Sequence, residues 1–334
     1  MKFIDLSKED RQDIIRRVQA ENGMDLQIIE KDWWVTTVLR ALFSLPYSNH
    51  ISFKGGTSLS KCWGLIQRMS EDIDIAIDRE YLGFSGQLSK NQISDKLRRT
   101  ACSFVRETLQ YDLAEQMIKD GISTENFKVH VNITPISTTD PEIIEVSYSP
   151  VFDSNPYIRS KVIIEVSGRS MSEPVANVNL HSYIDEVYTT APFAESDFEV
   201  RAVVPQRTFL EKLFLLHEEN HKPIGDIRTT RMSRHLYDVS QIMNTPIAKQ
   251  ALNDKKLYLS VIEHRRVFIG LRGFDYATLL PQTLNVLPSA EILELWKQDY
   301  QAMRESMIYG ESPSFDQLIE NLRALNAYIN TINY

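Results

Sequence analysis

Two glycines followed by a pair of aspartates form the part of this sequence best suited to chemistry. Residues 54–77 read KGGTSLSKCWGLIQRMSEDIDIAI, so a turn at Gly55 and Gly56 precedes Asp72 and Asp74. Side chains alternate between the two faces of a strand, so the aspartates share one face and the isoleucines between them fill the other. Paired carboxylates suit Mg²⁺ or Mn²⁺, which take hard oxygen ligands together with substrate phosphates. The segment therefore predicts a platform for a divalent metal ion.

The glycine turn supplies what such a platform lacks, a place for phosphate groups. Glycine lets backbone N–H groups approach a phosphate closely, and the start of a helix carries partial positive charge. The hydroxyls of Thr57 and Ser58 follow at this predicted helix start. Neither half is specific alone, since a lone GG is usually a turn and a lone DxD is usually an exposed strand edge or loop. Joined at this spacing, they predict a site for metal and a nucleoside triphosphate (NTP).

The same stretch resembles the first motif of the AbiEii/AbiGii-type nucleotidyltransferase toxins, a branch of the DNA polymerase β-like superfamily. The matching residues are the GGT turn and the string R-x-S-x-D-I-D, which here comprises Arg68, Ser70, Asp72, Ile73 and Asp74. Four further stretches resemble the family in order: residues 30–43 (EKDWWVTTVLRALF), 161–170 (KVIIEVSGRS), 207–223 (RTFLEKLFLLHEENHKP) and 231–242 (RMSRHLYDVSQI). The likeness extends over roughly residues 25 to 245.

The resemblance implies a function and a set of partners. Similar proteins are metal-dependent nucleotidyltransferases that transfer a nucleoside monophosphate from an NTP to an acceptor hydroxyl and release pyrophosphate. They act as toxins of toxin–antitoxin or phage-defence systems, which implies a cognate antitoxin. Similar toxins modify tRNA, so the expected acceptor is RNA, above all a tRNA 3′ end. Arg68 and Ser70 belong to the first motif and are expected to bind nucleotide with the glycine turn.

Lys212 and Asp238 enter the predicted site through the resemblance. Lys212 lies on an apolar-rich helix, TFLEKLFLLH, where a charged side chain normally points to solvent. It falls on the Lys motif of the family, which implies a contact with the triphosphate and the leaving pyrophosphate. Asp238 falls on the Asp motif, and two roles stay open for it: orienting Lys212 or orienting the nucleotide.

Glu165 is the candidate for a third acid. Strand alternation puts it on one face with Ile163 and Ser167, opposite Val162 and Ile164. There it would complete the metal ligands and accept the proton of the attacking hydroxyl. The alternative is a polar residue on the solvated side of a strand.

A rival motif occurs between His217 and His221, where HEENH matches the HExxH signature of zinc proteases. Pro223 would end the helix two residues later, and no obvious third ligand follows. A chance match is the better interpretation. The alternatives to a nucleotidyltransferase are therefore a non-catalytic NTP-binding regulator and, behind it, a zinc metalloprotease.

Composition limits the remaining function classes. The net charge of −8 over 334 residues argues against a uniformly basic nucleic-acid binder. Local basic clusters occur and are read either as phosphate contacts or as solvated helix surface: Arg228, Arg231, Arg234 and His235, then Arg265, Arg266 and Arg272. Two cysteines indicate a reducing compartment, and neither a signal peptide nor a run of about 18 apolar residues occurs. We expect a cytoplasmic protein without a membrane span.

Periodicity predicts an α+β protein, a polymerase β-like mixed sheet with flanking helices and a helical C-terminal region. Ser7 and Asp10 should cap a first helix that stops near Gly23. Further helices are expected at 25–42, from the glycine turn to about 66, and at 91–119. Strands are expected at 51–54, from Asp72 with alternation as far as Asp78, and at 127–133, 143–148, 162–166, 175–180 and 198–204. We expect a catalytic domain at 1–205 and a mainly helical domain at 206–334, divided at a loop around Pro205.

Overall fold

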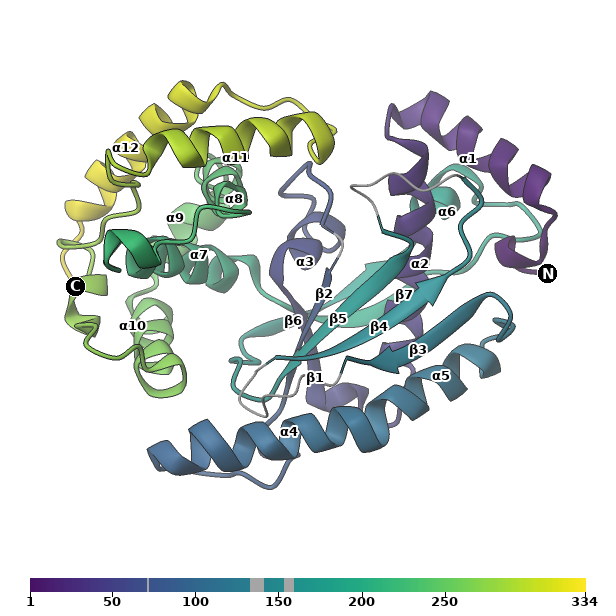
Figure 1. Ribbon diagram of the computed structural model, residues 1–334, viewed down its shortest axis with the longest axis horizontal. Coiled ribbons are helices and arrows are strands. Elements are labelled where there is room, and N and C mark those ends of the chain that lie inside the picture. Colours follow the sequence, from purple (N-terminus) through teal and green to yellow (C-terminus); the bar gives the residue numbers. More distant parts are fainter. Residues whose placement is uncertain (71, 133–140, 153–158) are drawn as a thin grey trace. The chain divides into compact units, whose positions relative to one another are not determined.

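Within the residues that the computed structural model describes (1–70, 72–132, 141–152 and 159–334), seven strands form one mixed sheet (Figure 1). Their order is β3-β4-β5-β2-β1-β7-β6. The strands are β1 (Ile51–Lys54), β2 (Asp72–Ile77), β3 (Phe127–Val131), β4 (Glu142–Tyr148), β5 (Lys161–Ser167), β6 (Val175–Leu180) and β7 (Phe198–Val203). Parallel pairs join β2 to β5 and β1 to β7, and the other neighbours are antiparallel. This arrangement confirms the predicted α+β class.

The strands form where alternation predicts them, because each has one face to bury. In β2, Ile73 and Ile75 have no exposed surface, whereas Asp72 and Asp74 are half-buried. The predicted strand positions are confirmed to within one or two residues. Residue 133, the expected end of the strand that begins at Phe127, lies outside the described residues.

Helices cover the apolar face of the sheet. Trp34 of α2 (Leu26–Phe43) stacks on Tyr148 of β4 with ring centroids 4.9 Å apart. On the same face, Arg106 donates to Glu142 at 2.9 Å from the helical stretch that contains α4 (Arg98–Phe104) and α5 (Gln110–Lys119). Figure 1 shows this stretch running along the sheet beside β3. The half-buried acids of β2 and β5 lie on the other face.

The N-terminal helix begins and ends as expected. The Asp10 N–H donates to Ser7 Oγ at 3.1 Å at the start of α1 (Lys8–Asn22). Gly23, with a φ of +72°, ends it. The prediction for the helix after the glycine turn is wrong in length, because α3 (Gly55–Lys61) stops five residues before Ile66. Gly64 follows with a φ of +59°, a left-handed conformation that no helix continues.

The chain divides into two compact units, the first of residues 1–62 and 69–203 and the second of residues 63–68 and 204–334. The first unit contains the sheet and also α6 (Tyr183–Val187). The second contains α7 (Pro205–Asn220), α8 (Ser233–Ile242), α9 (Pro246–Asn253), α10 (Lys255–His264), α11 (Leu293–Ser306) and α12 (Phe315–Asn330). Pro205 is the first residue of α7 and not part of a loop, and the periodicity gives no sign that residues 63–68 belong with the helical unit.

Among the described residues, no helix is both long and apolar enough to cross a membrane. Within the described part of the chain, neither Cys62 nor Cys102 takes part in a disulfide bond.

Candidate active site

Three carboxylates lie on neighbouring strands and on one face of the sheet. Asp74 of β2 stands directly opposite Glu165 of the parallel strand β5, and Asp72 stands opposite Ile163. Adjacent strands lie about 4.8 Å apart, so the carboxylates of Asp74 and Glu165 begin on neighbouring backbones. Asp72, Asp74 and Glu165 are all half-buried. The register thus puts the three acids that the sequence singles out on one face of two neighbouring strands.

Gly55 closes one side of this group of acids. Its φ of +78° is a left-handed conformation that favours glycine. A Cβ at this position would lie 1.9 Å from Oδ2 of Asp74, far inside van der Waals contact. The backbone at the start of α3 therefore lies directly against the Asp74 carboxylate, and both constraints require glycine here.

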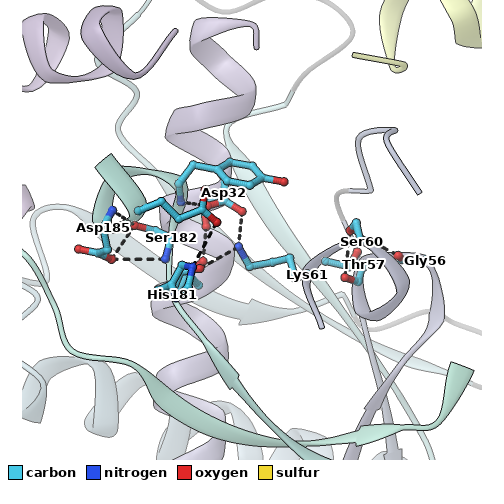
Figure 2. A network of polar contacts seen from close by, with 11 residues as sticks. Asp32, Gly56, Thr57, Ser60, Lys61, His181, Ser182 and Asp185 are labelled. Atoms are coloured by element: carbon cyan, nitrogen blue, oxygen red, sulfur yellow. Dashed lines mark hydrogen bonds and ion pairs between the residues drawn. The ribbon is translucent and has the colours of Figure 1, made fainter. Parts of the chain in front are cut away.

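The hydroxyls after the glycine turn point into the protein. Thr57 and Ser58 are 2% and 1% exposed. Thr57 Oγ1 donates to the backbone carbonyl of Asp72 at 2.5 Å, which ties α3 to the first residue of β2. Ser60 Oγ donates to the Thr57 carbonyl at 3.0 Å (Figure 2). Thr57 thus has a structural contact at the start of β2, and the expected contact of Thr57 and Ser58 with nucleotide stays a prediction.

The donor set suits a hard cation. Within the described part of the chain, no group of three or more His, Cys, Asp or Glu side chains is arranged to hold a metal ion by itself. Asp72 and Asp74 offer only oxygen donors, and two carboxylates are a set with which Mg²⁺ keeps water and substrate oxygens as further ligands. Gly55 keeps the space beside Asp74 clear of a side chain. The residues present therefore fit Mg²⁺ or Mn²⁺ and not a closed zinc site.

The second unit contains a separate buried group of charges. Lys212 of α7 donates from Nζ to Asp238 Oδ2 of α8 at 2.7 Å. Arg68 donates to the same carboxylate twice, from Nε to Oδ1 and from Nη2 to Oδ2, each at 2.7 Å. Lys212, Arg68 and Asp238 are 7%, 2% and 0% exposed. The apolar helix therefore buries Lys212 and does not turn it toward solvent.

These charges do not cancel. Burial opposes ionisation of Asp238, but the charges of Arg68 and Lys212 and their hydrogen bonds outweigh it and hold the pKa of the carboxyl well below its usual range. Burial lowers the pKa of Lys212, and the charge of Arg68 lowers it further against the opposing effect of Asp238. Burial and the charges of Lys212 and Arg234 keep the pKa of His235 well below its ordinary value. Of the three side chains joined by these contacts, Arg68 and Lys212 are bases and Asp238 is an acid, a balance that suits an anionic ligand.

The geometry of the HExxH string does not support a zinc site. His217 is fully buried and uses both ring nitrogens, since Nδ1 accepts from the Asn285 N–H at 2.8 Å and Nε2 lies 3.0 Å from Thr278 Oγ1. The Thr278 hydroxyl donates its proton to the backbone carbonyl of Asp275. The hydroxyl oxygen therefore accepts a hydrogen bond from Nε2 of His217. Glu218, the base of a protease, is ion-paired with Arg265. The string therefore belongs to the core of the helical unit.

Two arginines of the predicted basic clusters are also committed to carboxylates of their own unit. Arg228 donates to the buried Glu219 from its backbone N–H at 2.7 Å and from its guanidinium at 2.7 and 3.0 Å. Arg265 donates from Nε and Nη2 to the two carboxylate oxygens of Glu218. Arg231 is exposed, and its backbone N–H donates to Asp299 at 2.6 Å. Arg228 and Arg265 are therefore poor candidates for phosphate contacts.

Two carboxylates have structural contacts that the sequence motifs do not predict. Asp299 of α11 accepts from the Ser233 N–H at 2.9 Å and from its hydroxyl at 2.6 Å, and so caps the start of α8. Asp32 of α2 is buried beside Lys61 at the end of α3. Asp299 leaves no local signal. Asp32 leaves one, the run of three charged residues at 30–32 inside an apolar helix.

Comparison with known proteins agrees with the motifs. The family model described as nucleotidyl transferase AbiEii toxin, type IV TA system, matches residues 37–321 and confirms the resemblance. MenT4, a nucleotidyltransferase toxin (Rv2826c) from Mycobacterium tuberculosis H37Rv, is similar in structure with a TM-score of 0.49 and 15% identity over 98% of both chains. JHP933 from Helicobacter pylori has a TM-score of 0.42 and 13% identity, with 92% of this chain and 94% of that chain covered. No curated protein matches this sequence.

Replacing Gly55 with alanine should abolish nucleotidyl transfer, because the new Cβ would displace the Asp74 carboxylate. Gly23→Ala is the matched control, since Gly23 has a similar φ of +72° but no atom within 4 Å of the added Cβ. Each variant should lose about 1–2 kcal/mol of stability from the left-handed conformation. Transfer of label from an NTP, measured beside denaturant unfolding, separates the effects. Equal activity in the two variants would contradict the role of Gly55.

Protonation of His217 should make acid conditions destabilising. Burial, with the nearby His221, lowers the pKa of His217 from 6.5 to about 4. Between these values the unfolded state binds more protons, so the free energy of unfolding should rise with pH up to about 6.5 and be constant above it. The full difference is about 3 kcal/mol. Unfolding in urea from pH 4.5 to 7.5 should show this slope reduced in His217→Gln and retained in His221→Gln.

The slopes of wild type and His217→Gln are compared directly, which cancels the titration of other groups. Parallel slopes, or stoichiometric zinc lost in both histidine variants, would contradict a structural histidine.

Proposed function

The chain belongs to the AbiEii family of nucleotidyltransferase toxins of type IV toxin–antitoxin systems, and we propose that it transfers a nucleoside monophosphate from an NTP to an acceptor hydroxyl with release of pyrophosphate. The observation that supports this reaction most strongly is the register of β2 and β5, which puts Glu165 beside Asp74 on the face that also carries Asp72. The close approach of Gly55 to Asp74 adds a backbone turn suited to phosphates at the same place.

Each residue of the first unit has a defined part in this proposal. Asp72 and Asp74, with Glu165 beside them, would hold Mg²⁺ or Mn²⁺, which when bound neutralises charge on the phosphates. Glu165 accepts the proton of the attacking hydroxyl. Gly55 and Gly56 present backbone to the phosphates. Because phosphoryl-type transfer depends mainly on positioning and charge neutralisation, these groups need no covalent nucleophile.

Lys212 is proposed to bind the triphosphate and to stabilise charge on the leaving pyrophosphate. The excess of positive charge around it supports an anionic ligand. Asp238 acts on Lys212 and not on the nucleotide, since its carboxylate already accepts from Lys212 and twice from Arg68. Arg68 in turn supports Asp238. Ser70, half-buried before β2, stays a proposed nucleotide contact.

The proposed acceptor is an RNA 3′ end, with tRNA favoured. The first basic cluster of the helical unit is proposed to contact its phosphates; Arg231 of this cluster is exposed, whereas the Arg228 guanidinium is held by Glu219. A cognate antitoxin is the proposed protein partner, as the toxin–antitoxin family suggests. A regulator that binds NTP without turnover would have no need for three acids in register.

Loss of either aspartate should remove transfer without unfolding the protein. Asp72→Asn and Asp74→Asn each remove a charge from a half-buried side chain, and the loss of a metal ligand should lower the rate about 10³-fold. Asp78→Asn is the control, because Asp78 continues the same alternation at the exposed end of β2 and pairs only with His50 and a backbone N–H in the described residues. The assay combines each labelled NTP, Mg²⁺, and total RNA or protein extract, then measures pyrophosphate and the labelled product.

Activity within a few-fold of wild type in Asp72→Asn or Asp74→Asn would refute the assignment of these acids. NTP binding without pyrophosphate release in the wild type would instead favour the regulator.

Reversing the charge of Arg231 should impair labelling of RNA but leave NTP binding intact. Arg231→Glu removes one proposed phosphate contact, so the salt dependence of RNA binding should become shallower by about one unit in the slope of log K against log salt. Arg323→Glu is the control, because Arg323 is also exposed in the same unit but belongs to neither basic cluster. Filter binding over a range of salt concentrations measures both variants. Normal RNA labelling by Arg231→Glu, or labelling of protein alone, would contradict the RNA acceptor and leave the chemistry standing.

A further inference from the structure

The end of α3 farther from the carboxylates is held by a buried ion pair. Lys61, the last residue of α3, donates from Nζ to Oδ1 of Asp32 on α2. The two side chains are 5% and 7% exposed. Figure 2 shows the Lys61 side chain directed away from the glycine turn and toward Asp32 and the carbonyl of His181. Two long-range contacts therefore meet at one ammonium group.

Both partners of the pair bind a third element, the start of α6. Asp32 Oδ2 accepts from the Tyr183 N–H at 2.9 Å, and Lys61 Nζ lies 3.2 Å from the His181 carbonyl oxygen. This start is itself well defined, because the Ser182 hydroxyl donates to Asp185 at 2.6 Å and accepts from its N–H at 3.1 Å. The pair consequently joins α2, α3 and α6 at one point.

The other end of α3 contacts both aspartates. Gly55 lies against the Asp74 carboxylate, and Thr57 donates to the Asp72 carbonyl. With seven residues, α3 is about 10 Å long and too short to be stable through its own hydrogen bonds. Its placement depends on contacts with its surroundings. A displacement of α3 at Lys61 would therefore also displace its contacts with Asp72 and Asp74.

We propose that the Asp32–Lys61 ion pair positions the carboxylate site. It holds α3 in the position from which Gly55 contacts Asp74 and Thr57 contacts Asp72. Neither residue touches substrate in this proposal, and each acts through Gly55 and Thr57. The proposal rests on the proposed function. A purely stabilising role is a weak explanation for the pair, because burying two charges costs desolvation that a well-packed apolar pair avoids.

Four variants separate positioning from stability. Lys61→Met removes the charge at nearly constant length, and Lys61→Arg retains it. The double variant Asp32→Asn/Lys61→Met removes both charges, so no buried ion is left alone, and the amide oxygen introduced at position 32 can still accept from the Tyr183 N–H. Lys2→Met is the control, because Lys2 makes a 3.0 Å ion pair with Glu195 in the same unit but does not contact α3.

Two measurements that do not require turnover are made on the full chain. Hydrogen exchange reports the protection of backbone amides at 55–61, and titration with Mn²⁺ alone reports the metal affinity. We expect exchange at 55–61 at least tenfold faster and Mn²⁺ binding about tenfold weaker in Lys61→Met. Lys61→Arg should recover most of both properties, and Lys2→Met should change neither.

The double variant gives the decisive result. We expect its stability to return close to that of wild type while exchange at 55–61 stays fast and Mn²⁺ binding stays weak. Recovery of stability and Mn²⁺ binding together would overturn the proposal, as would unchanged exchange and binding in Lys61→Met. If the single variant does not fold, the double variant carries the same test. A wild type that neither binds Mn²⁺ nor transfers nucleotide would refute the proposed function, whereas the exchange data would still test the link between Lys61 and α3.

Discussion

The parallel pairing of β2 with β5 is the constraint on which the candidate site depends. It aligns Asp74 with Glu165 and Asp72 with Ile163, residues more than 85 positions apart in the sequence. A slip of one residue would turn every side chain of β2 to the opposite face and put both aspartates into the apolar core. The side chains of Ile73, Ile75 and Ile164 are completely buried. They oppose the slip, because it would separate these apolar side chains and expose apolar surface to water. The packing of the apolar face of β2 thus determines that the aspartates lie on its opposite face.

The second recurring feature is that charged side chains in the interior are held by more than one partner. Asp238 binds Arg68 and Lys212, Asp32 binds Lys61 and the Tyr183 N–H, and Glu219 binds Lys222 and Arg228. Isolated charges cannot be buried at acceptable cost, so each such residue constrains the elements that carry its partners. The groups around Asp32 and Asp238 differ in the balance of positive and negative charge. The first pairs one acid with one base, whereas the second keeps an excess of positive charge that suits an anion.

Within the first unit, the short helix α3 is subject both to the close packing against the strand acids and to the pairing of buried charges. Its glycine end must approach Asp74 without a side chain, and its lysine end must reach a carboxylate on α2. This explains why residues expected to bind nucleotide through their hydroxyls are buried: Thr57 is needed to join the helix to the Asp72 carbonyl. The motif is consequently both a phosphate-binding turn in the proposed function and a structural joint.

The sequence by itself determined the strands, the shared face of Asp72 and Asp74, the Ser7 cap and the family, because these depend on periodicity and on residues close in the chain. Alternation also placed Glu165 on the correct face of its strand, although not beside Asp74. Only the tertiary structure decided that Lys212 is buried, that Arg68 binds Asp238 and that Lys61 reaches Asp32. The first of these runs against the solvent-exposed position that composition favours. The contacts of Arg68 and Lys61 span 170 and 29 positions. No local pattern encodes which buried charge will meet which partner, since that is settled by the packing of whole elements.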